Sequence, residues 1–220
     1  MRLHLLSRVL GGGGADLPLS VRSQIDLEFT ALELHELEVT EPRVDFHEEI
    51  ARATQAARAG QVRDAATARA LYRRFGVDPT RYRPSSEALL RRVRRAEPLP
   101  RINSLVDVAN VMSLRLQIPV GLYDLDRVQG PELVIRLGSD GEGYTGIGKE
   151  QVNLAGRICV ADAAGACGNP SADSARTMIT TATERAAWIY FMKVGEPELD
   201  RTAELITRYG RGLVRVLTPL

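Results

Sequence analysis

The sequence predicts an α+β fold in which helices of the N-terminal half pack on a mixed β-sheet formed mainly by the C-terminal half. Two observations predict this class. Apolar residues recur at helical spacing between residues 45 and 116, whereas short alternating runs dominate after Pro119. The chain has 220 residues, of which 44% are hydrophobic and 26% are charged, and it is therefore long enough to bury one principal core.

The first predicted elements are strands. Between Ser23 and Val39 apolar and acidic residues alternate, as in a strand with one buried face. The apolar positions of this segment are Ile25, Leu27, Phe29, Leu32 and Leu34. We expect residues 1–45 to form an N-terminal strand region that belongs to the same core as the main domain at residues 46–220.

Four helices are then predicted before Pro119, and a fifth near the C-terminus. Each has an apolar stripe at helical spacing and a capping residue, glycine or proline near its ends. In chain order they run from Asp45 to Gly60, from Ala68 to Phe75, from Ser85 or Ser86 through Val93, from the N-cap Ser104 to Leu116, and from Glu198 to Tyr209.

The second half of the chain predicts short strands joined by turns. They are expected at Leu133 to Leu137, Arg157 to Ala161, Ala186 to Phe191 and the C-terminal run LVRVL. The segment PVGLYDLD after the fourth helix is expected to be a proline break followed by an Asp-rich turn. The run GEGYTG at residues 141–146 matches a dinucleotide fingerprint only formally, because no amphipathic helix follows it, and it predicts a glycine-rich hairpin turn.

Charge is distributed unevenly, although the formal net charge is only +1. Residues 26–49 hold nine acids against one arginine, whereas residues 69–101 hold ten arginines against three acids. The densest basic group is Arg91, Arg92, Arg94 and Arg95. Arginine suits bidentate contact with phosphate, so this group either binds tRNA or is a solvated face of a chain that is rich in arginine. The acidic segment either folds onto the main domain or mimics RNA against the basic helix.

Nucleophilic and metal chemistry have few candidates in this chain. The three histidines all lie in its first quarter, and Cys159 and Cys167 are spaced neither as zinc ligands nor as a redox pair. We therefore expect no metal and no cofactor, and we expect a cytoplasmic protein with reduced thiols. A Cys167 or Ser174 nucleophile stays open as an alternative. No apolar stretch is long enough to span a membrane.

The segment RINSLVDVANVMSLRLQIPVGLYDLDRV, residues 101–128, resembles the central region of the editing domain in the β subunit of bacterial phenylalanyl-tRNA synthetase, a B3/B4-type domain. Upstream, LYRRFGVDPTRYRPSSEALLRRV resembles the freestanding relatives of that domain, and downstream ICVADAAGACG and SARTMITTATERA follow the same pattern. The resemblance covers Leu71 to Phe191. It implies a compact α+β domain whose pocket receives the 3′ end of a wrongly charged tRNA and hydrolyses the aminoacyl ester.

The resemblance also implies roles for single residues. Asn110 stands at the asparagine of the family's V-D-x-x-N helix, and Gly121 takes the place where the synthetase commonly has a pocket histidine. The synthetase's loop glutamate has no counterpart, which leaves Asp173 as the acid of that loop. The implied catalytic residues are Asn110, Asp173 and Arg176, and the implied pocket residues are Gly121, Leu122, Tyr123, Asp124 and Thr177.

Structural roles are the alternatives for three of these residues. Asp124 is equally suited to hydrogen-bond its own turn, Thr177 to bridge to the next strand, and Asn110 to pack on the helix surface. The leading hypothesis is a freestanding domain that hydrolyses a mischarged aminoacyl-tRNA in trans and does not aminoacylate tRNA itself. The alternative is a non-catalytic module of the same fold that binds tRNA or a free amino acid. Neither a membrane nor DNA is expected as a partner.

Overall fold

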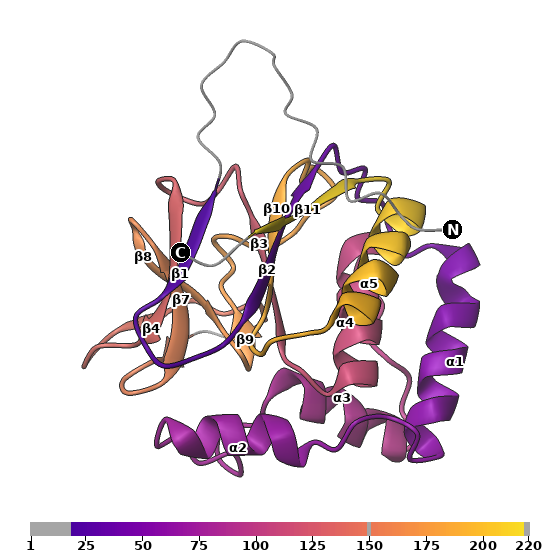
Figure 1. The fold of residues 1–220 in the computed structure, drawn as a ribbon, viewed down its shortest axis with the longest axis horizontal. Helices are drawn as coiled ribbons and strands as arrows, with labels where there is room; N and C mark the ends of the chain where they lie inside the picture. Colours follow the sequence, from indigo (N-terminus) through magenta and orange to yellow (C-terminus); the bar gives the residue numbers. More distant parts are fainter. Residues whose placement is uncertain (1–18, 149–150, 218–220) are drawn as a thin grey trace.

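The computed structural model describes residues 19–148 and 151–217, which form a layer of helices against two packed sheets (Figure 1). The glycine run at residues 11–14 lies outside the described residues, so the predicted region at 1–45 is described only from Leu19 onward. None of the helices in the two described ranges has the length and apolar content needed to cross a membrane.

A four-stranded antiparallel sheet forms the middle layer. Its order is β11 (Leu213–Leu217), β2 (Thr30–His35), β10 (Ala186–Tyr190) and β3 (Val120–Asp124). The register places Trp188 of β10 opposite Leu32 on one side and Leu122 on the other. All residues of β10 are buried, because helices cover one face of this sheet and a second sheet covers the other.

The second sheet is mixed. Its order is β1 (Ser20–Ser23), β4 (Glu132–Leu137), β7 (Ile158–Asp162), β8 (Gly165–Asn169) and β9 (Ala172–Asp173), with only the β1–β4 pair parallel. Ile135 and Val160 of this sheet share a buried cluster with Ala187 and Ile189 of β10, so apolar side chains fill the space between the two sheets. A separate pair of short strands is formed by β5 (Gly143–Tyr144) and β6 (Val152–Asn153).

Helices α4 (Ser104–Leu116) and α5 (Glu196–Tyr209) pack on the outer face of the four-stranded sheet. Helices α1 (His47–Arg58), which follows the short 3-10 helix η1 (Val44–Phe46), and α3 (Ser85–Arg94) pack in turn on α4. Leu105 and Met112 of α4 belong to the same buried cluster as Trp188. Helix α2 (Ala66–Arg74) lies at the base of Figure 1 and instead inserts Leu71 into the core between the two sheets.

The α+β class is confirmed, as are the five predicted helices and the strands at β4, β7, β10 and β11. The strands divide into two sheets, whereas the alternation pattern alone indicates one. A period of two residues shows which side chains share a face, but it does not show which strand pairs with which. The run GEGYTG forms a turn and β5, with Gly141 at φ 74°, and a strand follows it rather than a phosphate-binding helix.

Three local predictions are wrong. Asp45 does not cap the first helix: the N-cap of α1 is Phe46, which makes no side-chain hydrogen bond, and the Asp45 carboxylate accepts hydrogen bonds from Arg43. The segment expected to be an Asp-rich turn contains the edge strand β3, which pairs with β10 along its whole length, and the turn begins only at Asp124. The N-cap of α4 is Asn103 rather than Ser104. The Asn103 side chain accepts a hydrogen bond of 2.9 Å from the backbone N–H of Val106, while the Ser104 hydroxyl accepts one of 3.0 Å from the N–H of Thr40.

We predict that Asn103→Ala lowers the free energy of unfolding by about 1 to 2 kcal/mol, because it removes this cap from a helix that is buried along most of its length. Urea unfolding measures the change. Asn110→Ala is the matched control on the same helix and should change stability by less than about 0.5 kcal/mol, because the Asn110 side chain is only half-buried. Equal losses in the two variants would contradict the assignment of the cap.

Candidate functional site

Tyr123 of β3 is fully buried where the edge of the four-stranded sheet meets β8. A Cβ atom on Gly121 would lie 2.4 Å from the Tyr123 hydroxyl oxygen, and a Cβ atom on Gly168 would lie 2.6 Å from its ring carbon Cε1. Both distances are too short for real atoms, so only glycine fits on either side of the phenol ring. The missing side chain at residue 121 thus leaves no open space, because the Tyr123 ring occupies it.

Two buried polar atoms lie in this region without a hydrogen-bond partner in the described chain: the Tyr123 hydroxyl and Oδ1 of Asp173. Asp173 of β9 pairs with Gly168 of β8, which brings its carboxyl group near the phenol. Burial raises the pKa of Tyr123 well above its ordinary value, and the negative charge of Asp173 raises it further. Buried polar atoms are rarely left unpaired, so this pair marks a place where a polar group can be bound.

Burial also raises the pKa of Asp173 to about 7, from an ordinary value of 3.8, against the opposing effect of the Leu122 backbone N–H. The residue as a whole is half-buried, but its Oδ1 is fully buried. A carboxyl group with this pKa is about half ionised near neutral pH, so it can both accept and donate a proton. Asp173 is therefore the strongest acid–base candidate in the predicted set.

Asn110 projects from α4, which packs on β3. Its side chain is half-buried and forms no hydrogen bond to any residue within the described ranges. The amide therefore remains free to bind a ligand. Within the described ranges the side chains of Asn110 and Asp173 form no hydrogen bond with each other.

Arg176, Thr177 and Asp124 are engaged in holding the loop after β9. Both guanidinium Nη atoms of Arg176 donate to the carboxylate of Asp162, at 2.8 and 2.9 Å. The Thr177 hydroxyl donates to the carbonyl of Cys167 at 3.2 Å, and the Thr177 carbonyl accepts the backbone N–H of Asp124. These contacts give the residues positioning roles in the loop.

The Asp124 carboxylate closes the same network. It accepts the hydroxyl of Thr183 at 2.7 Å and the backbone N–H of Asp126 at 3.0 Å. This is the turn-forming geometry that is typical of aspartate. Of the sequence-predicted pocket, the structure thus brings together Gly121, Leu122, Tyr123 and Asp173, whereas Asp124, Arg176 and Thr177 form a supporting loop.

The alternative nucleophiles do not have the environment that their chemistry requires. Burial raises the pKa of Cys167 far above its ordinary value and raises that of Cys159 to about 11, so neither thiol ionises near neutral pH. The hydroxyl oxygen of Ser174 is buried and accepts the backbone N–H of Arg176 at 3.1 Å. A hydrolase built on Cys167 or Ser174 is not supported by this geometry.

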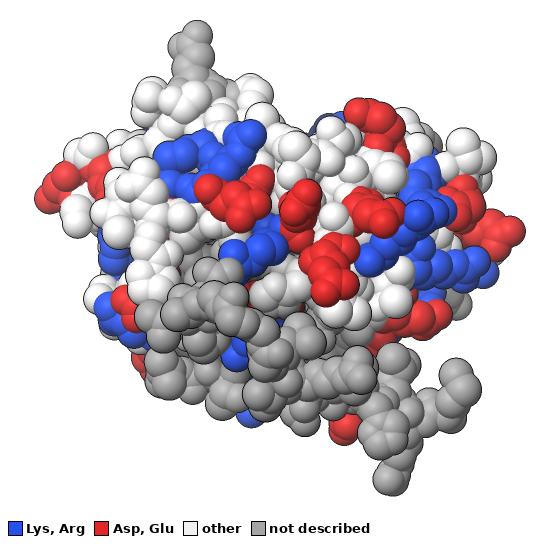
Figure 2. Space-filling view, turned by 90° about the horizontal axis from the view of Figure 1, so that it is seen from above, with Lys and Arg blue, Asp and Glu red and all other residues white. Residues whose placement is uncertain are grey.

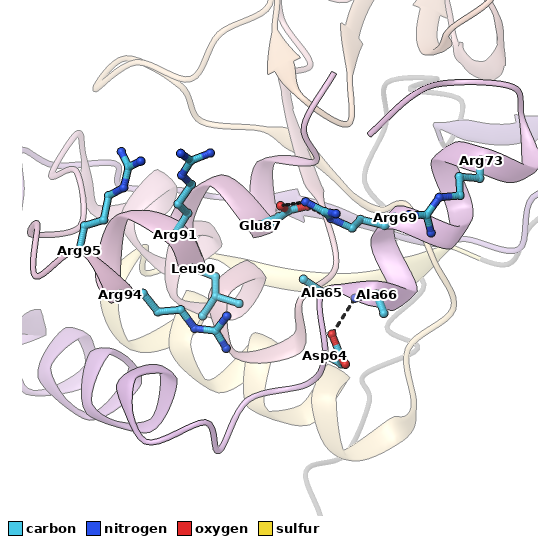
Figure 3. Close-up of a pocket in the computed structure, with 10 residues that line it drawn as sticks. All are labelled: Asp64, Ala65, Ala66, Arg69, Arg73, Glu87, Leu90, Arg91, Arg94 and Arg95. Carbon is cyan, nitrogen blue, oxygen red and sulfur yellow. Dashed lines mark hydrogen bonds and ion pairs between the residues drawn. The ribbon is translucent and has the colours of Figure 1, made fainter. Parts of the chain in front are cut away.

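A second feature is an open basic groove of about 620 Å³ between α2 and α3 (Figure 3). Its lining residues are Asp64, Ala65, Ala66, Arg69, Arg73, Glu87, Leu90, Arg91, Arg94 and Arg95. Three of the four sequence-predicted tRNA-binding arginines thus line the groove. Arg92 does not line the groove. Its Nε donates to the Pro98 carbonyl, and its Nη1 lies 3.6 Å from Oε2 of Glu97.

Sequence reasoning missed the α2 wall of this groove. Arg69 and Arg73 are four residues apart on one helix, a spacing that places them on one face and that was visible in the sequence. That α2 faces α3 depends on long-range packing and had no sequence signal.

The acidic segment does not cover the groove. Its carboxylates pair with arginines elsewhere, such as Glu49 with Arg201 and Glu38 with Arg211. Acidic and basic side chains are intermixed on the face shown in Figure 2, which looks down on the molecule from the side opposite α2. The groove therefore differs from that face in having mainly one sign of charge.

Comparison with protein families matches residues 67–191 to the B3/4 domain. The chain belongs to the B3/4 domain family. This confirms the B3/B4-type relationship inferred from the residues. The matched B3/4 region runs from α2 to β10, so it contains the Asp173 region and all the arginines that line the groove, whereas Asp64, Ala65 and Ala66 of the groove precede it.

The other comparisons add no functional assignment to this B3/4 protein. No curated protein matches the chain. Among solved structures, an N-terminal fragment of the phenylalanyl-tRNA synthetase beta subunit from Pyrococcus horikoshii is similar, with a TM-score of 0.45 and 12% sequence identity. The similarity covers 90% of this chain and 50% of that one, so the chain spans half the length of that fragment.

We predict that Tyr123→Phe leaves the free energy of unfolding unchanged or raises it by about 1 kcal/mol, because it removes a buried hydroxyl that has no partner. Tyr144→Phe is the matched control. It should lower stability by about 1 kcal/mol, because the Tyr144 hydroxyl donates to the Ala172 carbonyl and accepts the Asn169 amide. Chemical denaturation compares the two variants, and a larger loss for Tyr123→Phe would show that its hydroxyl is bonded after all.

A third prediction concerns pH. The unfolded chain ionises Asp173 near its ordinary pKa of 3.8, whereas the folded protein holds the proton up to about 7. As the pH rises from about 4 to about 7, Asp173 loses its proton in the unfolded state but keeps it in the folded state. Ionisation therefore stabilises the unfolded state over this window, and the free energy of unfolding falls. Asp173→Asn should therefore become more stable relative to the unmutated protein across that window, as measured by unfolding at several pH values.

Proposed function

We propose that this B3/4 domain hydrolyses the ester bond of a mischarged aminoacyl-tRNA in trans. The observation that carries the proposal is the environment of Asp173. Its carboxyl group has a pKa of about 7 and a buried oxygen, and it lies near the Tyr123 hydroxyl, which has no hydrogen-bond partner in the described chain. The resemblance of residues 71–191 to the synthetase editing domain supplies the class of substrate. Such a function belongs in the cytoplasm, where charged tRNA is used.

In the proposed reaction a water molecule attacks the ester carbonyl carbon. Ionised Asp173 accepts a proton from the water as the new carbon–oxygen bond forms. The bond between the carbonyl carbon and the ribose oxygen then breaks, and the ribose oxygen receives the proton, which frees the amino acid and restores Asp173. The neighbouring ribose hydroxyl helps to orient the water, so the protein needs no histidine.

The remaining residues of the proposed site orient the substrate. The free amide of Asn110 binds a polar group of the aminoacyl moiety, and the backbone of residues 121–123 forms one wall. Arg176 acts indirectly, because its ion pair with Asp162 holds the loop that follows Asp173. The arginines Arg91, Arg92, Arg94 and Arg95 supply the positive charge that attracts the tRNA.

One observation favours the non-catalytic alternative. The Tyr123 ring fills the space between β3 and β8, and the chain has no side chain at residue 121 to contact a substrate. A module that binds tRNA or a free amino acid without hydrolysing an ester would be consistent with such close packing. The two functions differ in turnover, which is directly measurable.

The deciding experiment is deacylation of a panel of correctly and wrongly charged tRNAs by the purified protein. We expect rapid loss of one mischarged species, with a rate that rises with pH up to about 7 as Asp173 ionises. Asp173→Asn should lower the rate at least about 100-fold, because it removes the base, and Asn110→Ala should lower it by a smaller factor.

Asp126→Asn serves as the control, since this exposed residue lies in the turn after β3 and outside the proposed site. Its rate should equal that of the unmutated protein. Absence of turnover across the panel, with the protein folded, would reject the hydrolase and leave the binding module. Turnover that is insensitive to Asp173→Asn would keep the activity and reject this site.

A further inference from the structure

The groove between α2 and α3 has a surplus of positive charge. Its two acids are already engaged: Glu87 accepts two hydrogen bonds from Arg69, at 2.6 and 2.7 Å, and Asp64 accepts the backbone N–H of Ala66 at the start of α2. Four further arginines line the groove: Arg73, Arg91, Arg94 and Arg95. Within the described residues, none of these four lies within 4.0 Å of a carboxylate oxygen.

These charges stand on both walls of the groove. Arg73 lies on α2, one helical turn from the paired Arg69, and Arg91 lies on α3, one turn from Arg95 at the C-cap of that helix; this spacing of four residues corresponds to about 6 Å along a helix axis. Figure 3 shows Arg94 extending from α3 toward Ala65 at the start of α2. The same view shows the Arg69–Glu87 ion pair, which joins the two walls. Such an arrangement offers several contacts to a line of negative charges.

The lining of the groove distinguishes between classes of partner. Its apolar part is limited to Leu90 and two alanines, whereas protein interfaces centre on larger apolar and aromatic side chains. No aromatic residue lines the groove, and sequence-tolerant binding of single strands depends on aromatic stacking. Double-helical RNA hides its bases and presents phosphates and ribose hydroxyls, for which arginines alone are sufficient.

We propose that the groove between α2 and α3 binds the sugar–phosphate backbone of double-helical RNA through Arg73, Arg91, Arg94 and Arg95. The ion pair of Arg69 with Glu87 is a positioning element that holds the two walls together. This proposal rests on the proposed function only for its RNA partner: in a charged tRNA, the groove would hold the double helix that leads to the charged 3′ end. Binding of RNA in the groove does not depend on hydrolysis of the ester.

The test measures binding of uncharged RNA by fluorescence anisotropy. The probes are an RNA duplex of about 16 base pairs and an unstructured single strand of equal length. We expect tighter binding of the duplex. Combining Arg73→Glu with Arg94→Glu, one from each wall, should weaken duplex binding at least about 10-fold and reduce the slope of log K against log salt by about one for each phosphate contact removed.

Two controls separate this effect from general charge and from misfolding. Arg208→Glu makes the same charge change as either single groove substitution, Arg73→Glu or Arg94→Glu, but near the C-terminal end of α5 and away from the groove, and it should leave the affinity within about twofold at matched salt. Arg73→Gln with Arg94→Gln removes the charges without adding acids and should give a smaller loss in the same direction. Unchanged thermal unfolding of each variant shows that α2 and α3 are intact.

Equal affinity for single strand and duplex, or equal losses from the groove variant and Arg208→Glu, would overturn the proposal. Duplex binding that is lost in the groove variant supports it even when no charged tRNA is hydrolysed, so the outcome is independent of the deacylation panel. Conversely, hydrolysis by a protein whose duplex affinity is unaffected by the groove variant would support the enzyme and reject this groove as its RNA contact.

Discussion

The burial of β10 on both faces is the constraint on which the rest of the fold depends. Trp188 faces the helices, while Ala187 and Ile189 face the second sheet. The apolar side chains of β10 are therefore buried only when both layers are present. Strand β3 pairs with β10 and therefore lies at the same junction, with its outer edge near β8 and β9. The close approach of Tyr123 to Gly168, and the burial of Asp173 beside it, follow from this three-layer packing.

Much of the fold was predictable because its signals are local. Helix caps, apolar stripes and turn glycines lie within a few residues of one another, and they located the five helices and most of the strands. The assignment of strands to sheets was not predictable in this way, since pairing depends on contacts between residues far apart in the chain. Strand β3 was missed because Pro119 and Gly121 are turn signals, which pairing with β10 overrides.

The candidate site was only partly predictable. Asp173 was inferred as the acid of its loop from a family resemblance, but its buried oxygen and its raised pKa arise from packing that no local pattern encodes. Arg176 was a reasonable anion ligand by residue type, yet it lies in the loop after β9 and its partner Asp162 lies at the end of β7. The α3 arginines were visible as a run, whereas their separation into groove-facing residues and the internally bonded Arg92 required the three-dimensional arrangement.

The close packing of Gly121 and Gly168 against the Tyr123 ring restricts which substitutions this sequence can accept. Position 121 accepts no side chain while a phenol stands at position 123, and the same phenol forbids a side chain at position 168. The three positions are thus epistatic: a descendant that gains a larger residue at 121 or 168 has to reduce residue 123 first, in that order, to avoid a poorly folded intermediate. The region around Asp173 can therefore acquire a new lining only by exchanging residues as a set.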